Sequence, residues 1–300
     1  MIKHIVTPKQ VALAIGVSEA SLKRWCDKGL LRASRTAGGH RRLPISGVFE
    51  FLRQSGHQIV RPEVLGLPST TGHGDATIER VRELMQAALE QGDEEQVERL
   101  VMGLYLAGYS ICDICDKAFA EDFRRIGHSW QNGKIEVYRE RRACEIVHRV
   151  LGQLRAAVTP PPPDAPRAIG ATLEYDPYTL ATAMVALTLR EIGWNAESYG
   201  TGNPASTLCA AIRDQRPRLF WLSVSTIDSL ERFVEDGRQL YETAAQVGTA
   251  LVVGGRALTE PVRQRIRYSA YCDTLGHLVA FVRTLDSRSV QTKPSPAAVT

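Results

Sequence analysis

A run of four prolines, Pro160–Pro163, followed closely by Pro166, divides this chain. Proline lacks the backbone N–H that helices and central strands need, so neither element continues through such a run. The run is expected to act as a stiff linker over residues 159–166. The chain has 300 residues, which is too long for one ordinary hydrophobic core and predicts two or three domains.

Composition narrows the class of protein. The hydrophobic fraction of 44% and the charged fraction of 23% are close to average globular usage and exclude wholesale disorder. The sequence has neither an apolar run near the ~18 residues of a membrane helix nor the pattern of a signal peptide. Six cysteines in a chain of this length do not form a disulfide scaffold. We expect a cytoplasmic protein with no membrane partner.

Charge is distributed unevenly along the chain. Residues 1–56 contain ten Lys and Arg against three acidic residues, a balance of +7, whereas the remainder has a balance of −3. A compact basic module predicts a polyanionic partner, most often nucleic acid. Charge alone leaves a solvated basic surface as the alternative.

The first 30 residues carry helix start and stop signals. Thr7-Pro8 predicts a capped helix start, and Gly16 breaks that helix. Ser18 caps a second helix that Gly29 ends. Two short helices joined by a tight turn form a helix-turn-helix, whose second helix enters the major groove of DNA.

A hairpin follows these helices. Leu30–Ala33 and His40–Leu43 are the expected strands, and residues 34–39 form a turn with a Gly-Gly tip. The segments Ser21–Trp25 and Arg35–Arg42 resemble the winged-helix domain of MerR-like and excisionase-like regulators. The resemblance implies binding to a double-stranded DNA operator. The expected DNA-binding residues are Ser21, Lys23, Arg24, Arg35, His40, Arg41 and Arg42.

Residues 57–74 lack periodicity and are predicted to be a linker. Residues 75–158 then show four amphipathic helical patterns, which begin near Asp75, Asp93, Ser110 and Glu136. Apolar residues recur at i, i+3 and i+4 in each pattern. An antiparallel four-helix bundle is expected.

Two helices of this bundle carry soft ligands. Cys112 and Cys115 lie on the third helix, and Cys144 and His148 lie on the fourth. Tetrahedral zinc would accept this set of residues. The stronger interpretation is that these are core residues, because i, i+3 is also core spacing and zinc knuckles use loops.

Strands and helices alternate after the prolines, over residues 167–287, and residues 288–300 are expected to be a disordered tail. The apolar strands are Ala168–Leu173, Ala196–Tyr199, Leu219–Ser225, Ala250–Val253 and Tyr271–Thr274. This alternation predicts a flavodoxin-like, doubly wound α/β domain with a parallel sheet. Ligands bind such sheets at the carboxyl ends of the strands.

The helical region of residues 75–158 and the α/β region of residues 167–287 both resemble parts of cobalamin-binding proteins. Trp130 and Glu140 match the helical module that caps the corrinoid in type and spacing. Leu222–Ser225 and Val253–Gly255 match segments that surround the corrin's nucleotide tail. The ligand-binding residues implied by the resemblance are Trp130, Glu140, Asp176, Tyr178, Ser223, Ser225, Gly254 and Gly255.

Tyr178 stands where the family carries the histidine that ligates cobalt. Axial ligation needs a neutral imidazole, and a phenol is a poor replacement because its unperturbed pKa is near ~10. The substitution argues against histidine-ligated cobalamin. The alternatives are another tetrapyrrole such as haem, a corrinoid that keeps its own base, or no cofactor.

The three modules in this order resemble the CarH/LitR/CarA-type MerR-like photoreceptor repressors. The resemblance implies a transcriptional regulator that is a homo-oligomer and not an enzyme, in which a ligand or a protein partner controls assembly. The alternative is a cofactor-free regulator whose C-terminal half is a protein-interaction scaffold.

Overall fold

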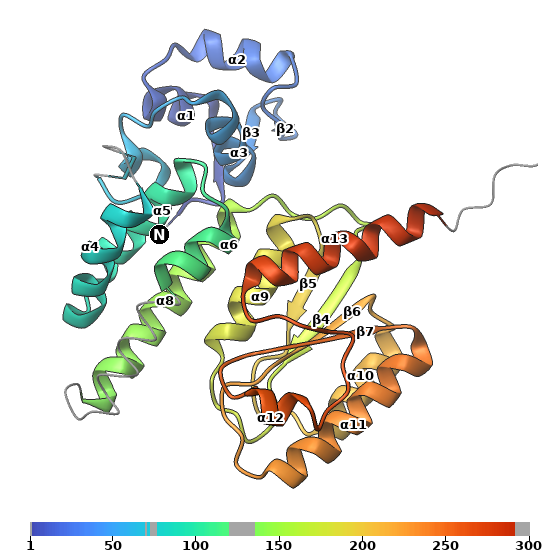
Figure 1. The fold of residues 1–300 in the computed structure, drawn as a ribbon. Coiled ribbons are helices and arrows are strands. Elements are labelled where there is room, and N and C mark those ends of the chain that lie inside the picture. The colour runs from blue at the N-terminus through green and yellow to red at the C-terminus, as the bar shows by residue number, and fades with distance from the viewer. Residues whose placement is uncertain (1, 70, 73–76, 120–135, 292–300) are drawn as a thin grey trace, which may run out of the picture. The chain divides into compact units, whose positions relative to one another are not determined.

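The computed structural model describes residues 2–69, 71–72, 77–119 and 136–291. The chain divides into two compact units, Met1–Pro163 and Asp164–Thr300 (Figure 1). The first holds a helix-turn-helix domain and a helical domain, and the second holds a parallel sheet covered by helices. The predicted multi-domain fold class is confirmed.

The helix-turn-helix begins with α1 (Pro8–Ile15) and α2 (Glu19–Asp27). Thr7 and Gln10 form a reciprocal capping box at the start of α1, and Ser18 Oγ accepts a hydrogen bond from the backbone N–H of Ser21. These side chains satisfy N–H groups that have no partner within a helix. α3 (Ile45–Ser55) completes the three helices of the domain.

The hairpin differs from the predicted one at its first strand. β2 is Ser34–Arg35, which was expected in the turn, and β3 is Arg41–Pro44. Leu30–Ala33 is not a strand, because Leu31 is buried in the domain core directly after the left-handed Gly29. β1 (Ile5–Val6) pairs with the other edge of β3 and makes a three-stranded antiparallel sheet.

The segment predicted to be a linker, residues 57–74, is partly packed. It contains the short 3-10 helix η1 (Pro62–Leu65), and its backbone N–H groups at Val60 and Arg61 donate to the carbonyl of Ala14 in α1. Ile59, Leu65 and Leu67 are buried. Proline and glycine interrupt the spacing of these side chains, so packing occurs without a helical or strand period in the sequence.

The helical domain consists of α4 (Ile78–Gln91), α5 (Glu94–Leu106), α6 (Ile111–Asp113), η2 (Ile114–Phe119) and α8 (Val137–Ala157). The third predicted helix starts at the Ser110 cap as expected, but η2 is a π-helix. Its apolar side chains remain buried: Ile111, Ile114, Ala118 and Phe119. The one-residue widening of a π-turn is often associated with functional sites.

The second unit contains five parallel strands in the order β5-β4-β6-β7-β8. Their bounds are β4 Arg167–Ala171, β5 Asn195–Ser198, β6 Leu219–Ser223, β7 Ala250–Gly254 and β8 Ala270–Tyr271. This is the flavodoxin order, in which the chain reverses direction across the sheet beside β4.

Helices cover both faces of the sheet. The side chains of α9 (Leu180–Glu191) and α13 (Leu275–Gln291) share one core cluster, and those of α10 (Ala205–Gln215) and α11 (Leu230–Val247) share the other. α12 is a single turn, Glu260–Arg263. α13 continues to Gln291, so residues 288–291 of the predicted tail are helical, and the rest of that tail lies outside the described residues.

Candidate DNA interface and candidate ligand edge

The helix α2 presents part of the predicted DNA-binding set. Its Leu22 is fully buried and fixes which face turns outward. Lys23 and Arg24 are exposed on that outward face, with Lys23 Nζ 2.9 Å from a carboxylate oxygen of Glu19. Ser21 Oγ lies 2.9 Å from Ser18 Oγ at the helix start. Both cations are therefore placed for a groove or phosphate contact.

The predicted wing residues divide between two faces of the β2–β3 hairpin. Arg35 pairs in register with Arg41, and Ser34 pairs with Arg42. Successive side chains of a strand point to opposite faces, so the side chains of Arg41 and Arg42 leave β3 on opposite faces of the hairpin. Arg41 forms an ion pair with Asp27 at the end of α2. The structure therefore gives Arg41 a role in fastening the wing to α2, while Arg35 and His40 are exposed.

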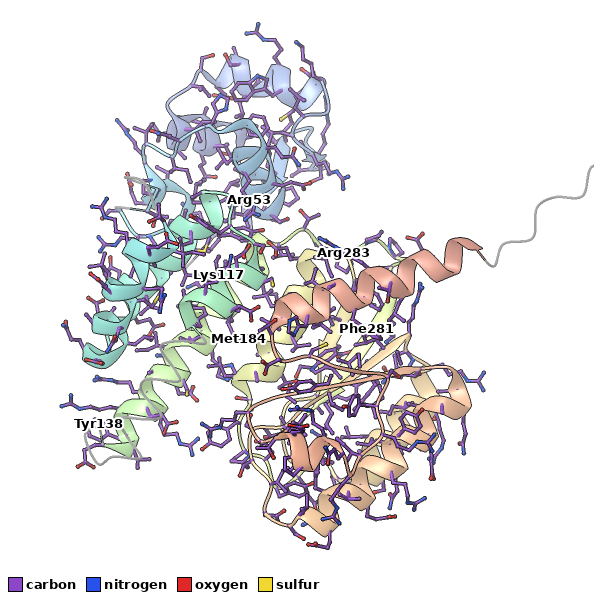
Figure 2. The ribbon with its side chains drawn as sticks, viewed as in Figure 1. Arg53, Lys117, Tyr138, Met184, Phe281 and Arg283 are labelled. Atoms are coloured by element: carbon purple, nitrogen blue, oxygen red, sulfur yellow. The ribbon has the colours of Figure 1, made fainter. Side chains whose placement is uncertain are left out.

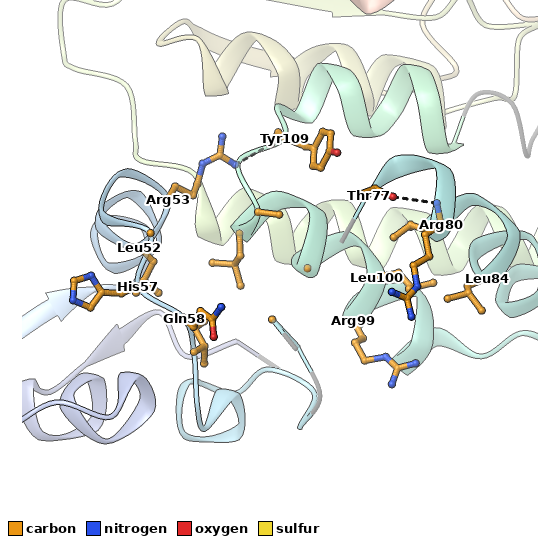
Figure 3. Close-up of a pocket in the computed structure, with 17 residues that line it drawn as sticks. Leu52, Arg53, His57, Gln58, Thr77, Arg80, Leu84, Arg99, Leu100 and Tyr109 are labelled. Atoms are coloured by element: carbon orange, nitrogen blue, oxygen red, sulfur yellow. Dashed lines mark hydrogen bonds between the residues drawn. The ribbon is translucent and has the colours of Figure 1, made fainter. Parts of the chain in front are cut away.

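Arg53 is counted in the basic charge of the first 56 residues, yet it binds protein. Its guanidinium donates to the carbonyl oxygens of Tyr105 at 2.6 Å and Tyr109 at 2.9 Å. It also lies 4.0 Å from the ring centroid of Tyr105. Figure 2 labels Arg53, and Figure 3 shows its hydrogen bond to Tyr109. A cation at a helix C-terminus satisfies the carbonyls that have no partner within the helix. Arg53 thus joins α3 of the helix-turn-helix domain to the end of α5.

The candidate metal residues do not form a cluster. Among the described residues, no group of three or more His, Cys, Asp and Glu side chains is placed to hold a metal ion. Cys112 and Cys115 belong to α6 and η2, and Cys115 is buried. Cys144 and His148 are half-buried on α8, where burial lowers the pKa of His148. Cys112 Sγ donates to a carboxylate oxygen of Asp116 at 3.7 Å.

Of the two ligand candidates in the helical domain, the structure places one. Glu140 lies in the first turn of α8 and is 8% exposed, so its carboxylate is close to the favourable end of the helix dipole. Trp130 lies outside the described residues. The predicted pairing of these two side chains over a ligand is therefore not tested.

Asp176 organises the carboxyl edge of the sheet. Its side chain is 1% exposed. One carboxylate oxygen accepts from the backbone N–H of Ser225 at 2.6 Å and of Thr226 at 3.3 Å, and the other accepts from the N–H of Tyr178 at 3.1 Å. Burial raises the pKa of Asp176 despite these three donors. The carboxylate therefore joins the loop after β4 to the loop after β6.

The other predicted edge residues gather around this link. Arg256 donates from Nε to the carbonyl of Ser225 at 3.1 Å, and its guanidinium lies 4.9 Å from the ring centroid of Tyr178. Ser223 is buried at the end of β6. Gly255 has φ of +123°, and a Cβ there would collide with the backbone of Val224. Gly254 and Gly255 are thus required by the close approach of protein backbone, without any ligand.

Sequence reasoning did not find Arg256. It also did not find the residues that pack in the interior next to the carboxyl edge of the sheet. Trp221 of β6 is 2% exposed and packs directly on Gly170 of β4, where a Cβ would overlap the indole ring. Its Nε1–H donates to Thr182 Oγ1 at 2.8 Å, and Thr182 lies 3.0 Å from Ser198 Oγ. A buried indole needs such a partner. The apolar run Leu219–Ser223 indicated a strand but not that its tryptophan occupies this interior.

Comparisons with known proteins identify two parts of the chain. A family model described as a helix-turn-helix domain matches residues 5–56, and one described as a B12 binding domain matches residues 81–155. The chain joins a helix-turn-helix domain to a B12-binding domain. This combination fits a cobalamin-binding-type regulator. No curated protein matches the chain.

Solved structures show the fold of the larger part. The monomethylamine corrinoid protein of Methanosarcina barkeri is 13% identical, with a TM-score of 0.60 over 70% of this chain and 100% of that one. A novel cobalamin-binding protein from Desulfitobacterium hafniense DCB-2 is 16% identical over 69% of this chain and 98% of that one, with a TM-score of 0.38. The methanol:cobalamin methyltransferase complex MtaBC of Methanosarcina barkeri is 15% identical over 85% and 87%, with a TM-score of 0.33. The first likeness establishes a shared fold alone, and the other two scores are too low to support an argument.

A corrinoid whose cobalt takes a protein imidazole does not fit the carboxyl edge. The loops after β4, β5, β6 and β7 contain no histidine; the second unit's one histidine, His277, follows the outer strand β8. Tyr178 offers a phenol that lies beside the Arg256 guanidinium. Both oxygens of Asp176 accept hydrogen bonds from backbone N–H groups. The donor set therefore lacks the nitrogen that such a cofactor requires.

Proposed function

We propose that this protein is a DNA-binding transcriptional regulator of the MerR-like type, and not an enzyme. The observation that carries the proposal is the exposed basic face of α2 in a helix-turn-helix domain that is packed onto a B12-binding helical domain. Arg35 and His40 extend the cationic surface onto the hairpin, as a wing that contacts phosphates would. The cognate partner is a double-stranded DNA operator.

The C-terminal region acts in this proposal as the switch that controls assembly of a homo-oligomer in the cytoplasm, in response to a ligand or a protein partner. The order of the modules supports this arrangement, because it is the order found in the CarH/LitR/CarA-type repressors. Self-association would bring several α2 helices onto one operator and raise its occupancy through effective concentration.

A second candidate is a cofactor-free regulator whose sheet domain is a protein-interaction scaffold. The filled interior beneath Trp221 and the internally bonded Asp176 favour it over histidine-ligated cobalamin. The remaining forms of the ligand-responsive switch are a corrinoid that keeps its own base, haem, or another tetrapyrrole, and Tyr178 is the phenol that lies at this edge.

DNA binding is tested by selecting operators from random duplexes with the full chain and measuring affinity against salt concentration. Arg35→Ala is expected to weaken binding to all duplexes and to reduce the salt slope by about 1, as for one lost phosphate contact. Arg155→Ala, an exposed arginine of α8, is the matched control and should leave the slope unchanged. Equal effects of the two variants would refute the wing assignment.

The switch is tested by incubating the full chain with cobalamins or haem, followed by gel filtration with absorption and light-scattering detection. A retained visible absorption band with a changed oligomer size supports a tetrapyrrole switch. A protein peak without visible absorption rejects that switch for these ligands and leaves the partner-responsive scaffold.

A further inference from the structure

The helix α2, which carries the predicted groove-reading side chains, has little apolar contact with the rest of its domain. Of its nine residues, all of which the structure describes, only Leu22 is buried. Trp25 is half-buried, and its ring centroid lies 5.1 Å from that of Phe51 in α3. With so few apolar contacts to set the tilt of α2, polar contacts at its ends carry more weight.

The β2–β3 hairpin is anchored at its base, whereas its outer part is exposed. Leu43 of β3 is buried and pairs in register with Val6 of β1. In contrast, every residue from Arg32 to His40 is exposed. Arg41 pairs with Arg35 in the last register pair before the turn, yet its side chain is only 19% exposed. Arg41 is thus covered at a position where the rest of the hairpin faces solvent.

The partner of Arg41 is the carboxylate of Asp27, the last residue of α2. Asp27 follows Lys23 by four residues, so both side chains lie on the same side of the helix. The helix dipole disfavours a carboxylate at this end, and on a surface that meets DNA a carboxylate repels phosphates. Arg41 neutralises that charge. The pair therefore adds no net charge to this surface, and its effect is geometric, because it ties the end of α2 to the outer part of the hairpin.

We propose that the Asp27–Arg41 pair is a specificity determinant that sets the separation between α2 and the wing. A duplex meets Lys23 and Arg35 at the same time only when its groove and flanking phosphates match that separation. Asp27 and Arg41 are positioning residues in this proposal, which rests on the DNA-binding function proposed above. Arg41 acts through the position of the wing and does not itself bind a phosphate.

The test compares the affinity of the full chain for a selected operator with its affinity for random duplexes, by fluorescence anisotropy. Asp27→Asn and Arg41→Gln should each lower the ratio of these affinities by about fivefold, the upper range for a partly exposed ion pair. The double variant should be no worse than the more affected single variant, because both changes remove the same interaction. Affinity for random duplexes should not fall in any variant, which also shows that the variants are folded.

Two further variants serve as controls. Arg41→Lys keeps a cation opposite Asp27 and should retain most of the ratio. Glu63→Gln, at an exposed acidic residue of η1, matches the charge change of Asp27→Asn and should leave the ratio unaltered. A general gain of positive charge strengthens binding to every duplex, so a loss of operator affinity in Asp27→Asn runs opposite to the effect of charge alone.

The proposal is overturned if Asp27→Asn binds the operator as tightly as the parent protein or more tightly, or if the losses of the two single variants add. It is also overturned if Arg41→Gln weakens binding to random duplexes with a smaller salt slope, since Arg41 would then be a phosphate contact. These outcomes leave the proposed DNA-binding function intact. A parent protein that binds no duplex selectively refutes that function and this inference with it.

Discussion

The carboxyl edge of the sheet and the junction of α3 with α5 in the first unit differ in the polar groups that hold them together. At the edge, the Asp176 carboxylate accepts from the backbone N–H of Ser225 and Arg256 donates to the carbonyl of Ser225, and the side chain of Trp221 is buried in the interior behind them. At the junction, the Arg53 guanidinium donates to the carbonyl oxygens of Tyr105 and Tyr109 and so bonds α3 to the end of α5. The fold directs attention to the edge as a ligand site, but there the polar groups bond to protein, as they do at the junction.

This difference teaches that a fold shows where relatives hold ligands, whereas the side chains decide whether one chain still does. Four predictions test the contrast, two at the edge and two in the first unit.

The largest effect is expected from Trp221→Ala. The indole is buried and hydrogen-bonded, so its removal leaves a cavity and should lower the free energy of unfolding of the second unit by about 3–5 kcal/mol. Hydrogen-exchange mass spectrometry on the full chain would report faster exchange in β4, β6 and α9, with residues 77–119 unaffected. If exchange there were unchanged, the interior would be less tightly filled than the structure shows. Thr182→Val, which removes only the acceptor of the indole N–H, should give a smaller change in the same peptides.

Asp176→Ala should cost about 2–3 kcal/mol, because it leaves partly buried backbone N–H groups of Ser225, Thr226 and Tyr178 without their acceptor. Urea denaturation followed by circular dichroism measures the loss. The exposed Asp273→Ala is the control and should remain close to the parent protein. If Asp176→Ala is as stable as the parent protein, the carboxylate does not hold the two loops together. Asp176 would then again be a candidate ligand-binding residue.

Arg53→Met should cost about 1–2 kcal/mol in the first unit, the value of charge-assisted hydrogen bonds at a half-exposed position. Methionine retains the apolar stem and removes the donors to Tyr105 and Tyr109. Exchange protection should fall at the end of α5 and in α3, whereas Arg155→Met should alter neither. Loss of protection in the second unit instead would contradict the assignment.

The smallest effect concerns pH and His148. Burial lowers its pKa below the ordinary value of 6.5, so the unfolded chain binds a proton more readily than the folded one as the pH falls. This contribution to stability is complete above pH 6.5 and is lost as the pH decreases through 6.5 toward the lowered pKa. His148→Gln should reduce this pH dependence in denaturation curves. A steeper dependence in the variant would show that the sign is wrong.

Much of the architecture could be predicted because local signals agree with packing. The helix Leu230–Val247 begins and ends at local signals, since Ser229 Oγ accepts from the N–H of Arg232 and Gly248 takes a positive φ. The strand order follows from alternating strands and helices in a doubly wound domain. Thr7, Ser18 and Ser110 each cap a helix as their positions indicated.

The site was less predictable because long-range partners decide it. Arg53 and Arg41 counted equally as basic residues, yet one binds α5 carbonyls and the other binds Asp27. The number of charged residues in a sequence does not reveal which group each charged side chain contacts. The described residues contain no helix with the length and apolar character needed to cross a membrane.

The hydrogen bond from Arg53 to α5 also bears on where the chain can be truncated. A fragment that ends at residue 56 would keep α2, but the Arg53 guanidinium would lose the carbonyl oxygens to which it donates. The fragment would also lack His57, whose ring contacts Trp25 and Phe51. The N-terminal strand is also anchored beyond that point, because the backbone N–H of Ile2 donates to Gln153 of α8. Cutting the chain at residue 56 would therefore remove contacts that the helix-turn-helix domain makes with residues 57–163.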